Sequence, residues 1–443
     1  MGEVCMMEKK IWVLICSSLL FFGACEVNLP ITGELWSIEK PTKLGVRSIS
    51  DSQVVRSNEG DVEYIIATWR DLEYISENFT SNEDLLGYNY IVVADITFPD
   101  RNSAPSDEDG SYAKEGFLPI GTEELPFSGT FDGRKNIIEN LVIDRGEENF
   151  VGLFGYVEGI PEDESVKIAN VYLREIRVTG KDKVGGLVGS IGGNTKVSNS
   201  YATGQINGRD TVGGLVGSLI GDADSITEIS NSYATGEVDG EIRVGGLVGG
   251  LLGADNGVTK VSNSYAIGEV NGTTNVGGLV GSLIGAADST TEISSSYATG
   301  YVHGRDSVGG LVGVDNLATT SNNYATGKVH GVNHVGGFIG LSIESTVEHN
   351  YATGKVIGNT TWGRFIGRRN GETVDISTNR VKNQETGDFM SVRLGGDSIE
   401  DEFLASKKEI TRMVYGWDFD GESSVWHWRD DGEWPILKWE LET

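Results

Sequence analysis

The chain has 443 residues, among them 62 glycines and only 8 prolines, and its formal net charge is −30. This charge argues against nucleic acid and anionic lipid as partners, because like charges repel. With 38% hydrophobic and 23% charged residues, the composition is too hydrophobic for a disordered chain, and its internal repeats favour one elongated domain.

The N-terminal residues have the features of a secretion signal. Two lysines precede an apolar run over 11–22, which is short for a membrane span. The run ends in Phe-Gly-Ala directly before Cys25, and this ending resembles a bacterial lipoprotein signal. The resemblance implies a signal peptide over 1–24 and acylation of Cys25, for example with palmitate, at the outer membrane. The other two cysteines lie inside the signal, so the mature chain would form no internal disulfide and no cysteine metal site.

Residues 25–60 would then comprise the lipidated cysteine and a polar tether that holds the folded part away from the bilayer. The next segment, 61–126, is predicted to be an N-terminal cap with the first strands. Thr68 followed by Asp71 indicates the start of a short helix, which suits a cap because an uncovered solenoid end exposes backbone edges and core. Residue types typical of strands occur over 62–66, 90–94 and 96–98.

A six-residue phrase, Val-Gly-Gly-Leu-Val-Gly, recurs through the segment 127–370. Complete copies begin at Val184, Val212, Val244, Val276 and Val308, with variants at Val151, Val335 and Trp362. A second phrase, Ser-Tyr-Ala-Thr-Gly, keeps step with it. Successive copies begin 27–33 residues apart, and repeats of this length predict a solenoid. The glycines permit bends between three short strands in each coil. Parallel stacking of such coils gives an all-β, right-handed parallel β-helix of about 8–9 coils.

These phrases resemble the repeats of the GLUG-repeat proteins, whose Gly-Leu-x-Gly core is seen here at 214–217. The preceding run 127–143 is similar to the usual lead-in of such repeats, and 416–420 with 434–437 is similar to their C-terminal end. The resemblance covers the chain from about residue 62 to about residue 440. It implies a bacterial surface protein, an adhesin-like protein or a non-catalytic part of a secreted protease.

Alignment of the coils places one tyrosine of each coil in a common column. The column contains Tyr172, Tyr201, Tyr233, Tyr265, Tyr297, Tyr324 and Tyr351. Side chains alternate between the two faces of a strand, and the columns of Ser200 and Ala202 hold Leu and Ile in the early coils. We therefore expect the tyrosines to form an outward ladder, either as a structural stack or as a face that binds a sugar or a partner strand. The opposite phase, with the rings inside the coils, remains open.

Two other columns are predicted to be structural. Leucines at one position of the glycine phrase should stack as a buried column. They are Leu215, Leu247, Leu279 and Leu311. An asparagine column at a bend should bond coil to coil through its side-chain amides. It contains Asn140, Asn170, Asn199, Asn231 and Asn263, is interrupted at Ser295 and resumes at Asn322.

The longer coils owe their extra length to three loops, which are expected to form one rim. The loops span 218–228, 250–260 and 282–292. Acidic residues of this rim are weak candidates for calcium ligands because Ca²⁺ prefers oxygen donors. They are Asp222, Asp224, Asp255 and Asp288. No other metal site or cofactor is expected. His303 and His330 hold equivalent positions, so these two side chains should be neighbours. We expect them to be surface residues rather than metal ligands.

The segment 371–443 departs from the repeat and is predicted to be a C-terminal cap. It contains five tryptophans, Trp417, Trp426, Trp428, Trp434 and Trp439. Their indoles should cover the last coil, and an exposed aromatic platform for sugars is the alternative.

No zinc-protease motif, nucleophile elbow or phosphate-binding loop occurs in the sequence, so no enzyme activity is expected. The sequence therefore predicts a lipid-anchored, surface-displayed, monomeric β-helix that binds a host or matrix protein or a glycan, as an adhesin does. It would contact the membrane only through its lipid. A polysaccharide-cleaving lyase or hydrolase and a purely structural envelope protein are the alternatives. An enzyme should show a cleft with two or more carboxylates of raised pKa.

Overall fold

The computed structural model describes nine segments of the chain. These are 54–56, 62–100, 114–159, 166–370, 378–382, 389–395, 398–403, 425–428 and 435–441. All of them belong to one compact unit, Val46–Thr443. The predicted signal, Cys25 and most of the tether lie outside the described residues. Within the described segments, no helix is long and apolar enough to span a bilayer.

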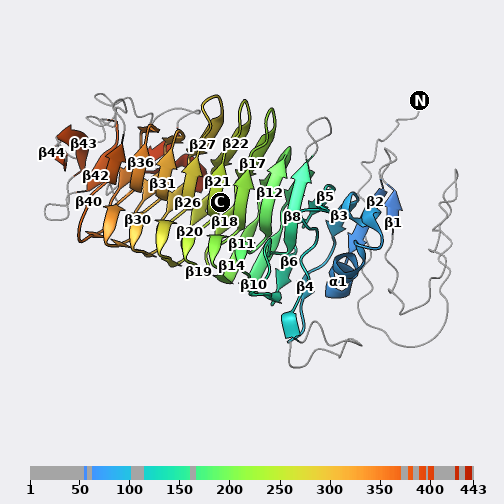
Figure 1. Ribbon diagram of the computed structural model, residues 1–443. Coiled ribbons are helices and arrows are strands. Elements are labelled where there is room, and N and C mark those ends of the chain that lie inside the picture. Colours follow the sequence, from blue (N-terminus) through green and yellow to red (C-terminus); the bar gives the residue numbers. More distant parts are fainter. Residues whose placement is uncertain are drawn as a thin grey trace, which may run out of the picture. The chain divides into compact units, whose positions relative to one another are not determined.

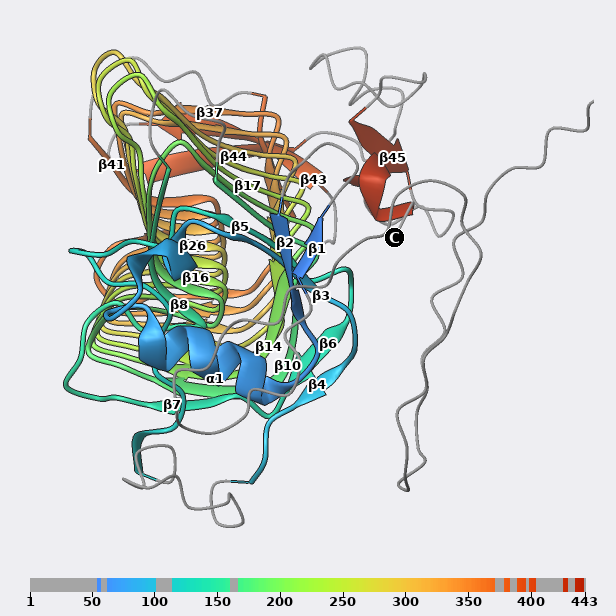
Figure 2. The same ribbon diagram turned by 90° about the vertical axis from the view of Figure 1, so that its right-hand side faces the viewer.

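The N-terminal part folds as the residue types predict. Strand β2 (Val62–Ile66) leads into helix α1 (Trp69–Asn78), whose N-cap Thr68 forms a capping box with Asp71. The helix buries Leu72 in the same core cluster as the coils, and Figure 2, which looks along the stack, shows α1 at its N-terminal end. The remaining elements of this part are β1 (Val54–Arg56), η1 (Glu83–Leu86), β3 (Asn89–Val92) and β4 (Ile96–Thr97). The strand predicted over 90–94 thus begins and ends earlier, and the one predicted over 96–98 is one residue shorter.

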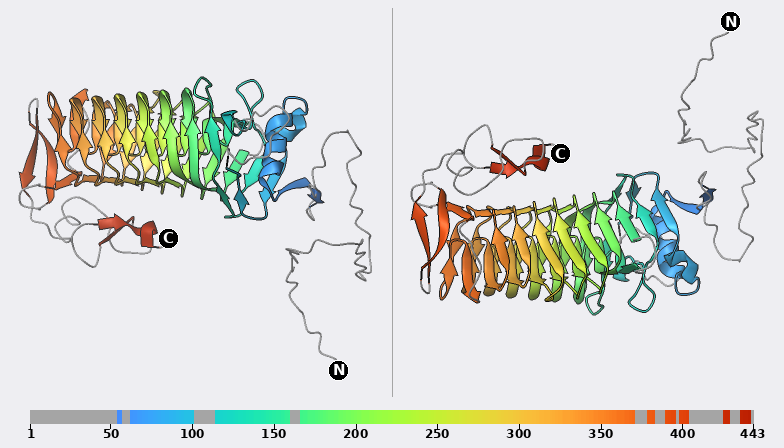
Figure 3. Two further views of the ribbon diagram at one scale, coloured as in Figure 1. Left: turned by 90° about the horizontal axis from the view of Figure 1, so that it is seen from below. Right: turned by 90° about the horizontal axis from the view of Figure 1, so that it is seen from above.

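The repeats form a parallel β-helix, which confirms the predicted fold class (Figures 1 and 3). Each full coil contributes to four sheets rather than three, so the predicted number of strands per coil is wrong. The first sheet contains β11 (Asp182–Gly185), β15 (Asp210–Gly213), β20 (Ile242–Gly245), β25 (Thr274–Gly277), β30 (Asp306–Gly309), β35 (Asn333–Gly336) and β40 (Trp362–Gly363). The second contains β8 (Phe154–Gly159), β12 (Val188–Gly193), β16 (Val216–Ile220), β21 (Val248–Leu252), β26 (Val280–Ile284), β31 (Val312–Asn316), β36 (Ile339–Ile343) and β41 (Ile366–Asn370).

The third and fourth sheets complete each coil. The third joins β1, β2 and β3 to β5 (Thr130–Asp132), β9 (Val166–Ala169), β13 (Thr195–Ser198), β17 (Ile226–Ser230), β22 (Val258–Ser262), β27 (Thr290–Ser294), β32 (Thr319–Ser321) and β37 (Thr346–Glu348). The fourth joins β4 to β6 (Ile137–Glu139), β7 (Val142–Asp144), β10 (Tyr172–Thr179), β14 (Tyr201–Asn207), β18 (Tyr233–Ala234), β19 (Glu237–Asp239), β23 (Tyr265–Ala266), β24 (Val270–Asn271), β28 (Tyr297–Ala298), β29 (Val302–His303), β33 (Tyr324–Ala325), β34 (Val329–His330), β38 (Tyr351–Ala352) and β39 (Val356–Ile357). From β18 onward a bend divides the fourth strand of each coil in two.

The glycine phrase forms the corner between the first and second sheets. The amide of Leu215 donates to the carbonyl of Leu247 at 3.0 Å, and all four predicted leucines have no exposed surface, which confirms the buried column. The phrase needs glycine because the chain approaches itself closely here. A Cβ on Gly245 would lie 2.0 Å from the carbonyl oxygen of Val248 and 2.7 Å from the amide nitrogen of Gly281. Only a residue without a side chain fits this corner.

The three predicted rim loops are mostly strand. In the first of them β16 and β17 extend toward each other, so that only residues 221–225 form the turn. The extended turns lie side by side in Figure 1, and the amide of Gly221 donates to the carbonyl of Leu252 in the next coil at 2.7 Å. The predicted stacking into one rim is confirmed, but the loops are shorter than predicted because strand pairing between adjacent coils continues into the longer repeats.

The C-terminal part leaves the repeat with antiparallel strands. Strand β42 (Arg380–Lys382) adds to β38 in parallel, and β43 (Phe389–Gly395) and β44 (Ser398–Phe403) follow it as an antiparallel pair. A separate hairpin, β45 (Trp426–Trp428) and β46 (Pro435–Leu437), continues into the short helix η2 (Lys438–Leu441). We call β45, β46 and η2 the C-terminal hairpin.

Candidate functional site

The tyrosine column forms a continuous stack of rings along the fourth sheet. Tyr172 pairs in register with Tyr201, and each later tyrosine pairs with the next in the same way. Neighbouring ring centroids are 4.5–5.0 Å apart, which is close to the spacing between paired strands. The rings are tilted by 31° between Tyr172 and Tyr201 and by 13° or less farther along. Backbone pairing therefore sets the spacing of the tyrosine ladder.

The rings lie outside the coils. Ser200 and Ala202, which flank Tyr201, are 1% and 2% exposed, whereas Tyr201 itself is half-buried. The two covered tyrosines of the ladder, Tyr324 and Tyr351, belong to a separate cluster with the C-terminal hairpin and not to the core of the coils. The outward phase is therefore the one present, and the alternative with the rings inside the coils is wrong.

Hydrogen bonds inside the coils fix this phase. Ser200 Oγ accepts the amide of Val171 at 3.1 Å, and the amide of Ser200 donates to Ser232 Oγ at 3.2 Å. In later coils the carboxamide oxygens of three asparagines accept the equivalent amides, those of Ser296, Asn323 and Asn350, at 2.8–2.9 Å. The accepting asparagines are Asn323, Asn350 and Asn379. A one-residue slip would leave these buried groups unpaired, so it is strongly disfavoured.

The predicted asparagine stack lies one residue away from its expected column. The column from Asn140 to Asn322, including Ser295, has positive φ angles of 48–61°. Asn adopts this left-handed conformation more readily than most residues, so the column forms the bend before the fourth sheet. Coil-to-coil amide bonds occur instead in the next column, where Asn323 Nδ2 donates to Asn350 Oδ1 at 3.1 Å. The predicted bend is therefore confirmed, and Asn170 Nδ2 donates to Asp132 Oδ1 of the preceding coil at 2.9 Å, but the continuous amide stack predicted for this column is wrong.

The C-terminal hairpin covers the far end of the ladder. Tyr351 has no exposed surface and contacts Trp426, and the hydroxyl of Tyr324 donates to Glu440 at 2.9 Å. Trp439 stacks on Tyr265 and Tyr297, with centroid distances of 6.2 and 5.9 Å. Its indole nitrogen donates to the carbonyl oxygen of Ser295 at 2.9 Å.

This contact corrects two predictions. Tyr324 and Tyr351 are covered, so they are not part of an accessible face. Of the five tryptophans, Trp426 and Trp439 have described side chains, and Trp439 lies along the outer face rather than over the last coil. Trp417 and Trp434 lie outside the described residues, as does the side chain of Trp428.

The other end of the ladder remains accessible. We call Tyr172, Tyr201 and Tyr233 the open rungs; all three are half-buried by stacking and lie N-terminal to the Trp439 contact. Beside them, Arg174 pairs with Glu139, which also accepts a bond from Thr97 Oγ1 at 3.0 Å. Hydrogen bonds from Arg174 and Thr97 hold the pKa of Glu139 below its usual value. This edge of the open rungs is therefore polar and fixed.

Burial raises the pKa of several tyrosines of the ladder. Desolvation raises the pKa of Tyr201 and raises that of Tyr233 further, with added repulsion from neighbouring tyrosines. At the covered end, the pKa of Tyr324 is raised most strongly by burial, and Tyr351 and Glu440 add to this effect. These hydroxyl groups remain protonated donors at neutral and mildly alkaline pH, so the face can bond to neutral or anionic oxygens.

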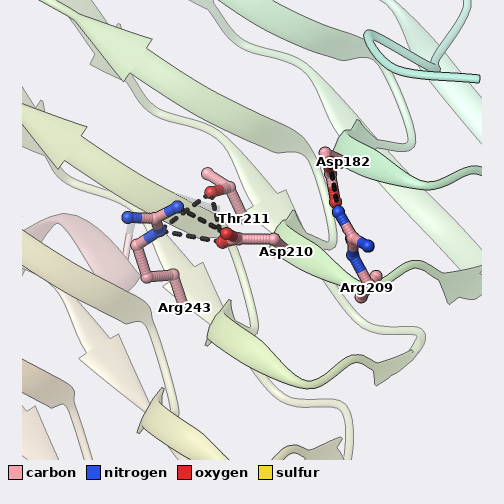
Figure 4. A network of polar contacts seen from close by, with 5 residues as sticks. All are labelled: Asp182, Arg209, Asp210, Thr211 and Arg243. Carbon is pink, nitrogen blue, oxygen red and sulfur yellow. Dashed lines mark hydrogen bonds and ion pairs between the residues drawn. The ribbon is translucent and has the colours of Figure 1, made fainter.

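A second ladder on the first sheet was not predicted. Arg209 pairs with Asp182 of the preceding coil at 2.7 Å, and Arg243 pairs with Asp210 at 2.6 Å, as Figure 4 shows. His334 pairs with Asp306 at 2.8 Å in the same way. Opposite charges at neighbouring positions of successive coils are the sequence signal. Because the groups are partly exposed, each pair stabilises the fold only slightly.

The predicted rim acids do not converge. Asp222 is bonded within its own turn, since Ser225 Oγ donates to its carbonyl at 2.8 Å, and Asp224 occupies a left-handed position. Asp255 and Asp288 are exposed in the next two turns. In the segments that the structure describes, no three Asp, Glu, His or Cys side chains are arranged to hold a metal ion. The predicted histidine neighbours do meet, with a centroid distance of 5.1 Å between His303 and His330.

Among the residues that the structure describes, two carboxyl groups have raised pKa values. Asp315 is fully buried, accepts a bond from Thr320 Oγ1 at 2.9 Å, and has a pKa raised to about 7 by burial. Partial burial, with repulsion from Asp222 and Glu123, raises the pKa of Glu158. Sequence reasoning missed Asp315, although it interrupts an inward column that contains Leu283 in the preceding coil.

Comparison with known proteins identifies the repeats. The family model described as the GLUG motif matches residues 184–207 and 208–239. Halomucin from Haloquadratum walsbyi is 33% identical over 207 residues, which are 46% of this chain. That match spans only 2% of the length of halomucin.

A solved structure from Bacteroides ovatus, provisionally named an immunoglobulin A1 protease, matches with 17% identity and a TM-score of 0.43. The match covers 87% of this chain and 95% of the other. At this level of similarity, no activity can be carried from one protein to the other. This chain therefore contains GLUG repeats and folds as a parallel β-helix.

Proposed function

We propose that this protein is a lipid-anchored, cell-surface binding protein with an adhesin-like role, and that the open rungs are its binding face. Its ligand would be a host or matrix protein or a glycan. The protein would act as a monomer, without catalytic activity and without binding nucleic acid. The lipid on Cys25 would be its contact with the outer membrane.

The binding role is supported by the way Trp439 packs on the tyrosine ladder. This indole lies on two rungs of the ladder and donates to the carbonyl oxygen of the bend residue, Ser295. The open rungs have the same bend beside them, at Asn199 and Asn231, with nearly the same φ angle. The ladder therefore repeats, at its accessible end, an arrangement that holds a flat ring group elsewhere in this chain.

The positions of the two carboxyl groups of raised pKa support a non-catalytic role. Glu158 lies in β8 and Asp315 in β31, and five strand pairings separate these two strands in the second sheet. At about 4.8 Å for each pairing, the two groups lie roughly 24 Å apart. Glycosidic cleavage needs two carboxyl groups within about 10 Å. These two groups therefore cannot act on one bond.

Two observations support a place at the cell surface. The N-terminal sequence resembles a lipoprotein signal that ends at Cys25. The similarity to halomucin over 207 residues adds a second argument. The coils would then stand outside the membrane on the tether formed by residues 25–60.

The test is binding of the detergent-extracted full chain to an array of matrix proteins and uncharged glycans. The variant Tyr201→Ser with Tyr233→Ser should lose the binding that the wild-type protein shows. Tyr324→Phe is the matched control, because it changes a covered rung. Binding that is equal in the ladder variant and the wild type would overturn the proposed face, and a chain that binds nothing on the array would overturn the proposed role.

A further inference from the structure

The outer face of the fourth sheet changes its charge along the stack. Four residues after each tyrosine from Tyr201 onward, the coils carry Gln205, Glu237 and Glu269, and then Tyr301, Lys328 and Lys355. In the coil of Tyr172, the residue that pairs with Gln205 is Arg177. These positions are neighbours across coils, since Val238, Val270, Val302, Val329 and Val356, each the next residue in its coil, pair in register. The column is therefore acidic at Glu237 and Glu269 and basic over the last coils. This change is unusual in a chain with a net charge of −30.

The basic part of this column is ordered by its aromatic neighbours. Lys328 Nζ lies 5.0 Å from the ring centroid of Tyr301, and the Tyr301 hydroxyl lies 3.3 Å from His330 Nδ1. The ring of His303 lies 5.1 Å from that of His330. We call Tyr301, His303, Lys328, His330 and Lys355 the basic patch. The contacts of Tyr301 with Lys328 and His330 order these three side chains before any ligand arrives, which lowers the entropy cost of binding.

The lysines of the patch have no acidic partner in the described part of the chain. Both side chains are exposed, and neither forms an ion pair with a described Asp or Glu. The preceding coil places Glu269 next to Tyr301, which limits the patch to the last coils. At physiological ionic strength, exposed charges are screened beyond about 8 Å, so the patch rather than the net charge governs a contact at this place.

We propose that the basic patch binds an anionic polysaccharide that carries carboxylate or sulfate groups. Lys328 and Lys355 are one coil apart, about 4.8 Å along the stack, so each can hold one anionic group of a linear glycan that lies across the coils. The rings of Tyr301 and His303 offer flat surfaces beside these charges. A long polyanion of high charge density, such as DNA, would extend over the acidic column and be repelled there.

This inference rests on the proposed function, because it names a ligand class for a surface binding protein. It concerns a site separate from the open rungs. The two sites can therefore fail independently, and the same protein preparations test both.

The experiment measures binding of the full chain in detergent to heparin and to polygalacturonate, with neutral dextran and duplex DNA as comparators. The decisive variant is Lys328→Glu with Lys355→Glu. It places in these coils the residue that Glu237 and Glu269 provide in earlier coils, so the fold should tolerate it. The control is Lys135→Glu with Lys167→Glu, which changes the net charge equally at two exposed lysines elsewhere.

The wild type and the control should bind an anionic polysaccharide, and the patch variant should bind at least about tenfold more weakly. Equal binding by the patch variant, equal loss in the control, or DNA binding as tight as glycan binding would overturn the inference. Tyr201→Ser with Tyr233→Ser should leave this binding unchanged. If only the ladder variant loses its array ligand and the patch variant loses nothing, the patch inference fails while the proposed function stands.

Discussion

Replacing Asp315 by Asn should make the protein more stable at neutral and alkaline pH. Asp315 takes an inward position that Leu219, Leu251 and Leu283 hold in the preceding coils. Thr320 Oγ1 donates to one carboxylate oxygen, and burial raises the pKa of Asp315 to about 7 from an ordinary value of 3.8. The folded chain therefore binds a proton at Asp315 in a pH range where the unfolded chain has released it.

The sign of the effect follows from proton linkage. Between about pH 4 and pH 7 the folded state holds more protons at Asp315 than the unfolded state, so the free energy of unfolding falls as the pH rises. A difference of about three pKa units corresponds to about 4 kcal/mol, because each unit contributes about 1.4 kcal/mol. Asparagine is neutral at every pH, so the Asp315→Asn variant should lack this loss.

The assay is unfolding by guanidinium chloride at pH 4.5 and pH 8, followed by circular dichroism. Wild type and Asp315→Asn should unfold at similar denaturant concentrations at pH 4.5, and the variant should be more resistant at pH 8. Asp224→Asn, which changes an exposed acid in a turn, is the control and should behave as the wild type does at both pH values. If Asp315→Asn shifts the midpoint equally at both pH values, the carboxyl group does not titrate as its burial implies.

The other predictions concern the core, the corner and the anchor. Leu247→Ala should lower the free energy of unfolding by about 2–5 kcal/mol, whereas Ile242→Ala, at a side chain 40% exposed, should change it far less; a Leu247 effect below about 0.5 kcal/mol would mean that the register is wrong. Gly245→Ala should lower the melting temperature strongly because its Cβ meets backbone atoms of this corner and of the next coil, whereas Gly146→Ala has room; equal melting temperatures would contradict the close approach. Cys25→Ala should move the protein from the membrane fraction to the soluble fraction and abolish labelling by a fatty-acid analogue, and unchanged membrane partitioning would exclude the lipid anchor.

The sequence predicts most of the coil because successive repeats fix the register. Leu215 and Leu247 hold one position in consecutive coils, so their stacking follows from the period alone. The outward phase of Tyr201 follows from the Leu and Ile residues in the neighbouring columns of the early coils. The role of the asparagine column could not be predicted in the same way, because the residue type alone does not separate a left-handed bend from an amide stack.

The repeat pattern does not predict where the C-terminal hairpin packs. Five tryptophans predict burial against an apolar surface, but the last coil and the tyrosine ladder both offer one. The contact of Trp439 with Tyr265 and Tyr297 depends on which of these two surfaces the C-terminal hairpin packs against, and this hairpin lies outside the repeats. Asp315 was missed for a related reason, since a single departure from a repeat is visible only when its column is known to face inward.

The most direct test of the binding face is chemical modification of the tyrosines with and without bound ligand. Nitration of the full chain, followed by mass spectrometry, reports the accessibility of each ring separately. The open rungs, Tyr172, Tyr201 and Tyr233, should react in the free protein and become protected when a ligand found on the array is bound. Tyr324 and Tyr351 should react in neither state, because the C-terminal hairpin covers them. Equal reaction of the open rungs in both states would contradict the proposal that ligand binds on the tyrosine ladder.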